Sequence, residues 1–338
     1  MWRLGLFFGM LICLVQFIRT KLNIIGFCAS SLWFYTLLSS LISIEFPRVF
    51  HGIYNTAFMA TAGQSFAESI LIPLTILSVP REWDKKFFHF FSAIVLIEIA
   101  LIWLKIKGLM VAPSFDTALI ALFIPFAPIW LVVLSVVTIL SHHGSTAMMI
   151  LGVQGLVYLQ SKNKLKLGLL CLVPTLLLVA WFHSNGPMLD GGERWDTWKS
   201  FIIHWWDGTK IIQNEAGRSL ELLSFGGDWI SRFIGVGSGS FVWVSLITEP
   251  KKMFLQAHSE LVQISIELGL FGLSLFILTI LDAIKNTLNR PKILAAVLGC
   301  VACSLTYHPL RWFQTSILVG FIFKQALMRG DYNEHARS

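Results

Sequence analysis

A histidine and two glutamates stand close together in the segment 257–273, which reads AHSELVQISIELGLFGL. Histidine changes its charge near neutral pH, so His258 is a natural group to accept a proton from an attacking hydroxyl. The alternative interpretation is an interfacial histidine that caps the apolar helix following it. Glu260 and Glu267 are the acidic residues of the segment, and both are candidate substrate-binding groups.

Helix geometry limits the role of the second glutamate. On a straight helix, nine residues at about 100° each place Glu267 roughly opposite His258 and about two and a half turns deeper. Glu260 and Glu267, seven residues apart, would share a face. We therefore expect Glu267 to pack against or orient another helix, and we expect Gly269 and Gly272 to permit close helix approach.

Five further residues could hold an anionic group. A guanidinium offers phosphate a bidentate fork, which favours Arg194, Arg218 and Arg311, and an arginine near an apolar run is costly unless it faces a polar cavity. His142 and His143, in the turn Ser-His-His-Gly-Ser, are weaker anchors because a neutral imidazole carries no charge. The alternatives are solvated loop arginines and a turn with incidental histidines.

The stretch 235–241, GVGSGSF, contributes Gly235, Gly237 and Gly239. It follows no evident strand and lacks the Lys-Ser/Thr of a nucleotide-binding P-loop, so a tight structural turn is the preferred interpretation. Cysteine spacing also argues against a bound metal, because Cys300 and Cys303 have no His or further Cys to complete a ligand set. We expect neither a metal nor a cofactor.

Helices must position these residues, because apolar runs occupy most of the chain. Of 338 residues, 55% are hydrophobic and 13% are charged, and the mean hydropathy is +0.71. This composition excludes a disordered chain and argues against a soluble enzyme, and a run of about 20 apolar residues can span a bilayer as a helix. We predict an all-α polytopic membrane protein with about ten spans, at 2–18, 22–44, 53–79, 86–104, 117–140, 145–160, 167–182, 260–284, 292–308 and 310–327.

One large loop, 183–257, divides the spans of 1–182 from those of 258–338, and we expect it to form a partly helical subdomain outside the bilayer. This arrangement puts both termini on the cytoplasmic side. The short inside segments then carry thirteen basic residues against six outside, as the positive-inside rule expects. The net charge of +7 therefore reports topology and does not indicate nucleic acid.

Three motifs, ordered along the outside face, resemble the O-antigen polymerase and O-antigen ligase superfamily. They are Arg194 with Trp198, the stretch 235–241, and the segment 258–272. The family pattern is Arg-x-x-x-Trp, GxGxxxF, and a histidine motif leading to Glu-x-Gly-x-x-Gly. Arg218 is a rival for the first motif but lacks a tryptophan four residues on, and histidines replace the arginine that the family usually has in the turn at 141–145.

The resemblance implies a metal-independent C-type glycosyltransferase at the periplasmic face of a bacterial inner membrane. It would move a glycan from undecaprenyl diphosphate to an acceptor hydroxyl, with His258 as catalytic base and Arg194 and Arg311 on the diphosphate. A polymerase, whose acceptor is another glycan, is favoured over a ligase, whose acceptor is lipid A core. A chain-length regulator in the membrane is a further expected partner.

Two other classes stay open at this stage. A polysaccharide transporter or flippase is suggested by Gln64, Glu68 and Glu98, which are polar residues inside predicted spans, although transporters usually contain internal repeats and none is evident. A non-enzymatic assembly partner is the other class. Polar groups gathered under the outside loop would favour the enzyme, and polar groups at mid-membrane would favour the transporter.

Overall fold

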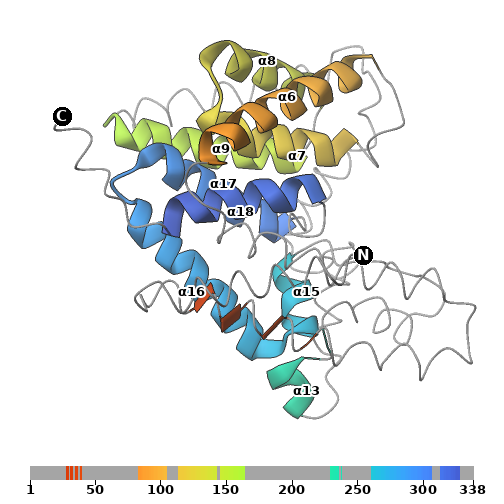
Figure 1. Ribbon diagram of the computed structural model, residues 1–338, viewed down its shortest axis with the longest axis vertical. Coiled ribbons are helices and arrows are strands. Elements are labelled where there is room, and N and C mark those ends of the chain that lie inside the picture. The colour runs from red at the N-terminus through yellow and green to blue at the C-terminus, as the bar shows by residue number, and fades with distance from the viewer. Residues whose placement is uncertain are drawn as a thin grey trace, which may run out of the picture.

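The computed structural model describes residues 83–104, 113–142, 145–163, 229–235, 237, 260–306 and 313–327, with seven residues between 28 and 39. The ordered elements within these ranges are helices, and the described part of the chain contains no strand (Figure 1). The prediction of an all-helical fold is therefore confirmed for these residues. The elements are α6 (Asp84–Trp103), α7 (Pro113–Phe123), the 3-10 helix η2 (Ile124–Phe126), α8 (Ile129–His142), α9 (Ser145–Ser161), α13 (Trp229–Ile234), α15 (Glu260–Glu267), α16 (Gly269–Thr287), α17 (Pro291–Thr306) and α18 (Phe313–Leu327).

The described helices expose several large apolar side chains and bury some charged ones. Two of them, α6 and α16, are long and apolar enough to cross a membrane. Large apolar side chains such as Ile97, Ile129 and Leu281 are exposed, whereas Glu98 and Lys324 are buried. Ionisable residues in a bilayer are expected to face the interior of a bundle, so this distribution suits helices surrounded by lipid.

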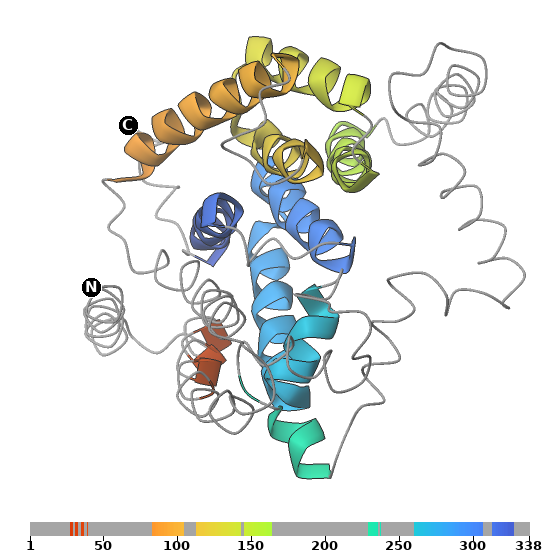
Figure 2. The same ribbon diagram turned by 90° about the vertical axis from the view of Figure 1, so that its right-hand side faces the viewer.

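Helix α7 forms the centre of the described bundle. Its residues from Ala118 to Phe123 are almost completely inaccessible to solvent, and it contacts α6, α8, α9, α17 and α18. Figure 2 shows α7 and α9 running side by side next to α17. Phe321 of α18 packs against Phe88 with ring centroids 5.1 Å apart, and it also contacts Phe126 at 6.0 Å.

The predicted span 117–140 is not a single helix. Helix α7 ends at Phe123, and α8 begins at Ile129, with Pro125 and Pro128 between them. Proline lacks the backbone N–H that an uninterrupted helix needs, and its ring clashes with the preceding turn. The prediction was wrong here because the apolar character of the segment continues through a break that only the two prolines mark.

The chain reverses direction at this break. Phe88, near the start of α6, contacts Phe126, just before α8. Trp103, at the end of α6, donates a hydrogen bond of 3.0 Å to Thr138, near the end of α8. Helices α6 and α8 are therefore parallel, and α7 between them leads back from the far end of α6 toward its start.

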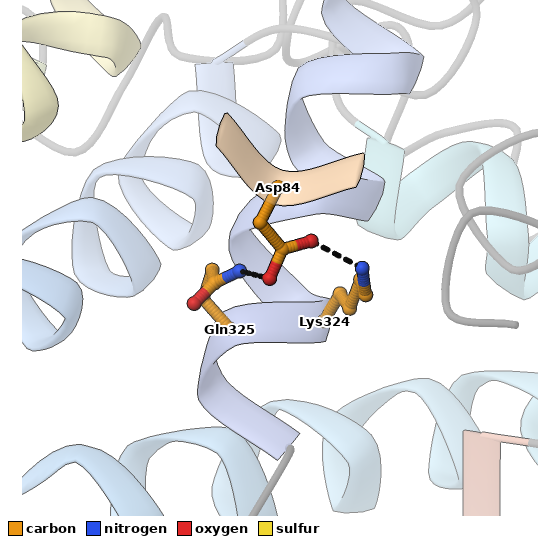
Figure 3. A network of polar contacts seen from close by, with 3 residues as sticks. All are labelled: Asp84, Lys324 and Gln325. Atoms are coloured by element: carbon orange, nitrogen blue, oxygen red, sulfur yellow. Dashed lines mark hydrogen bonds and ion pairs between the residues drawn. The ribbon is translucent and has the colours of Figure 1, made fainter. Parts of the chain in front are cut away.

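A charged cluster joins the start of α6 to the end of α18 (Figure 3). Lys324 forms an ion pair with Asp84, and the side-chain amide of Gln325 donates to the other Asp84 oxygen at 2.6 Å. Arg290, in the turn between α16 and α17, donates to the carbonyls of Gln325 and Ala326 at 3.0 and 3.1 Å. These three points of the chain therefore lie at one end of the bundle.

This contact corrects the predicted topology. The predicted spans 53–79, 86–104 and 310–327, with both termini on the cytoplasmic side, put the start of α6 outside and the end of α18 inside. Both assignments cannot hold, because Asp84 and Lys324 touch. The reversal at Pro125 supplies the reason, because it adds a change of direction that the apolar pattern conceals. Grouping Lys85 and Lys86 with Arg290 also agrees better with the positive-inside rule.

Cysteine labelling tests the corrected side of α6. Trp83 and Leu288 are exposed at the charged end, and Phe233 is exposed beside the start of α16, about 28 Å away along a helix of 19 residues. In intact spheroplasts, an impermeant maleimide should label Phe233→Cys, whereas Trp83→Cys and Leu288→Cys should react only after lysis. If Trp83→Cys and Phe233→Cys were both labelled in intact spheroplasts, the start of α6 would lie outside, as first predicted.

Candidate functional site

The structure describes part of the predicted site. Glu260, Glu267, Gly235, Gly237, Gly269 and Gly272 lie within the described residues. His142 belongs to the last turn of α8, where only its backbone is described. The other predicted residues lie outside the described residues, namely His143, Arg194, Arg218, Gly239, His258 and Arg311.

The predicted span 260–284 is interrupted directly after Glu267. Helix α15 ends there, Leu268 forms a bend, and α16 begins at Gly269, whose φ is +65°. The helical hydrogen bonds on either side persist, since Leu268 N–H donates to Ile264 at 2.8 Å and Gly272 N–H donates to Leu268 at 3.1 Å. The carbonyl of Glu267 instead accepts a 2.9 Å hydrogen bond from the N–H of Gly237.

The backbones of Gly235 and Gly269 lie against each other at this bend. Both residues have positive φ, at +81° and +65°. A Cβ on Gly235 would collide with the Glu267 carbonyl and would lie 2.5 Å from the Gly269 nitrogen, and a Cβ on Gly269 would collide with the Phe233 carbonyl. Glycine is therefore required at both positions, for the backbone conformation and for space.

Two of the glycines act differently from the expectation. The close neighbour of Gly269 is the 233–235 backbone and not another spanning helix, and a Cβ on Gly272 would collide with Leu268 in the bend. Gly237 also has a positive φ, +104°. Two motifs that are 30 residues apart in sequence thus form one structural unit, the glycine junction, which comprises Gly235, Gly237, Glu267 and Gly269.

Aromatic residues pack around the glycine junction. The ring of Phe271 contacts Tyr35 edge-on, with centroids 5.0 Å apart, and it also contacts Phe233 at 6.0 Å. The Tyr35 hydroxyl donates to the Ile234 carbonyl at the end of α13, and Figure 1 shows α13 beside the start of α16. Sequence reasoning missed Tyr35, because nothing in the apolar run around it marks a partner almost 200 residues away.

The buried face of α15 is polar. Glu260, Gln263 and Glu267 are spaced by three and four residues, so they share one face of the helix, and each is no more than 1% exposed. The Gln263 amide nitrogen donates to Glu267 Oε1 at 3.0 Å. The two glutamates were identified from sequence, and the i, i+3, i+7 spacing was the signal that could also have identified Gln263.

This face can accept hydrogen bonds from a polar ligand. Carboxylates and amide oxygens are acceptors, and burying them is costly unless donors are supplied. Helix α15 packs against α17 and α16, and the side chains of this face are buried. Among the residues that the structure describes, no group of His, Cys, Asp and Glu could hold a metal ion.

Comparison with known proteins adds no assignment to a family. No family model matches the chain, and no curated protein matches it significantly. The likeness to the O-antigen superfamily therefore depends on the three motifs alone.

Alanine substitutions test the glycine junction. Gly235→Ala or Gly269→Ala should destabilise the protein by about 3 kcal/mol or more, since positive φ costs an L-residue about 1–2 kcal/mol and backbone overlap adds to this. The measurement is the thermal midpoint of the purified protein in detergent. Gly155→Ala is the matched control, because nothing lies within 4 Å of its Cβ position in α9. Equal midpoints for all three variants would contradict the account.

Proposed function

We propose that the protein is a membrane glycosyltransferase that uses a lipid-diphosphate-linked glycan as donor, at the outer face of the bacterial inner membrane. One observation carries the proposal, namely the hydrogen bond and the glycine contact that join 235–237 to 267–269. These are the second and third motifs of the resemblance, and a shared site requires them to be adjacent. Their contact therefore supports a motif-level likeness that is otherwise only an order of residues.

The proposed chemistry is substitution at the anomeric carbon of the donor. His258, two residues before α15, takes the proton of the acceptor hydroxyl while the new glycosidic bond forms and the bond to the diphosphate oxygen breaks. Arg194 and Arg311 stabilise the departing diphosphate, with Arg218, His142 and His143 as further candidates. The donor bond supplies the energy, so the reaction needs no nucleotide.

A polymerase is the preferred member of this class, with a ligase as the alternative. Nothing in the amino-acid sequence marks a surface for lipid A core. The acceptor is then the glycan of a second lipid-linked unit, and a chain-length regulator is an expected partner. Deleting the gene distinguishes the two, because loss of a polymerase leaves surface polysaccharide with single units, whereas loss of a ligase leaves lipid A without any glycan.

A transporter remains the second candidate because of polar atoms in the middle of the helices. Glu98 Oε2, Ser135 Oγ and both amide atoms of Gln154 are buried without a hydrogen-bond partner in the structure as described. They come from α6, α8 and α9. Gln154 borders Gly299 of α17. A transporter would move a lipid-linked glycan across vesicles without forming a glycosidic bond.

The catalytic histidine gives the direct test of the enzyme. His258→Ala should lower turnover of an undecaprenyl-diphosphate-linked oligosaccharide by about 10²–10⁴-fold, the usual contribution of a general base. His89→Ala is the control, because His89 is exposed near the start of α6 and therefore lies at the charged end of the bundle. The assay measures product by mass spectrometry from purified protein in detergent.

Wild-type turnover by a folded His258→Ala variant would remove this residue from the reaction. Absence of any glycosidic product from the wild-type protein, together with translocation of a fluorescent lipid-linked glycan in vesicles, would favour the transporter over the enzyme.

A further inference from the structure

One acceptor atom on the polar face of α15 lacks a donor. Gln263 is 1% exposed, and its amide nitrogen is already used by Glu267. Its Oε1 has no hydrogen-bond partner within the structure as described. An unsatisfied buried acceptor costs about 1–3 kcal/mol, so the presence of this one points to a donor that arrives from outside the chain.

The charges around this atom select the kind of donor. Glu260 stands one turn before Gln263 and Glu267 one turn after it, and both are fully buried on the same face. Carboxylates repel an anion, so a diphosphate is a poor occupant of this face. A neutral group with O–H donors fits it, because a hydroxyl can supply the hydrogen bond that the Gln263 amide oxygen lacks.

The glycine junction holds the end of α15 in place. The Glu267 carbonyl accepts a hydrogen bond from the N–H of Gly237, which ties the last turn of α15 to Gly237. Gln263 is one helical turn before that point, and His258 is five residues before Gln263 in the sequence. The open acceptor is thus on the element that leads directly from the proposed catalytic base.

We infer that the α15 face binds the acceptor sugar, with Gln263 Oε1 accepting a hydrogen bond from one of its hydroxyls, and that the diphosphate of the donor is held elsewhere. This assignment rests on the proposed transferase function. It separates the site into an acidic acceptor side on α15 and a basic donor side. Such a division suits one neutral substrate, the acceptor sugar, and one anionic substrate, the donor diphosphate. Gln263 is a substrate-binding residue in this account.

The test compares a neutral probe with an anionic probe on the full-length protein in detergent. Methyl glycosides of glucose, galactose and N-acetylglucosamine represent the acceptor, and farnesyl diphosphate represents the donor head group. Binding is measured by microscale thermophoresis. Gln263→Leu should weaken the best-bound glycoside about three- to tenfold, the value of one neutral hydrogen bond, and should leave farnesyl diphosphate binding unchanged.

Gln154→Leu is the matched control, since Gln154 is also a buried glutamine with unpartnered amide atoms but lies in α9 beside Gly299. It should change neither affinity. If Gln263→Leu does not give a monodisperse protein, Gln263→Asn makes the same comparison, because it withdraws the amide by one methylene and keeps its chemistry.

Three results would overturn the inference, namely no binding of any glycoside by the wild-type protein, unchanged glycoside affinity in the Gln263 variant, or equal loss for both probes. Failure of the proposed function has a different signature. In that case the wild-type protein binds a glycoside through Gln263 but does not bind farnesyl diphosphate and forms no glycosidic bond.

Discussion

The backbone contact between Gly235 and Gly269 is the constraint on which the arrangement of the candidate site depends. Ending α15 at Glu267 leaves a carbonyl outside the regular helical ladder, and in an apolar environment such a group needs a partner. The N–H of Gly237 is that partner. It can reach the carbonyl only because Gly235 and Gly269, whose backbones lie against each other, carry no Cβ. Without this contact, either the helix would have to continue through residue 268 or the Glu267 carbonyl would lack a hydrogen-bond partner.

The break also changes what α15 can present. A continuous helix from 260 to 284 would present the same faces along its whole length. The bend at Leu268 instead makes α15 a short separate element, whose buried face carries Glu260, Gln263 and Glu267. The opposite end of α16 is fixed differently, since Arg290 binds α18 and Asp84 pairs with buried Lys324. A buried lysine is tolerated only with such a partner.

Sequence reasoning predicted features that depend on local composition and missed those that depend on distant partners. The all-helical fold and the bounds of α6 and α9 follow from apolar length, which is a property of the segment itself. A backbone role for Gly235 and Gly237 was expected from their residue type, and both have positive φ. The bend at Leu268 was not expected, because Gly269 is as consistent with helix packing as with positive φ until its neighbour 34 residues earlier is known.

The reversal at Pro125 was missed for a related reason. The apolar runs on the two sides of the prolines together have the length of one membrane span, so hydropathy favours a single helix. The structure has two shorter helices, α7 and α8, which run in opposite directions. Tyr35 shows the same limit. It was concealed within an apolar run, and the contact that gives it a role comes from α13.

The central claim is that the end of α13 is held against the start of α16, and a cross-linking measurement tests it most directly. In a cysteine-free background, the pair Phe233→Cys and Phe271→Cys replaces rings whose centroids are 6.0 Å apart. The pair Phe233→Cys and Leu281→Cys uses an exposed position about 15 Å further along α16. The account predicts rapid cross-linking by a short bis-methanethiosulfonate for the first pair and none for the second. Equal yields for the two pairs, or no cross-link at 233 and 271, would contradict it.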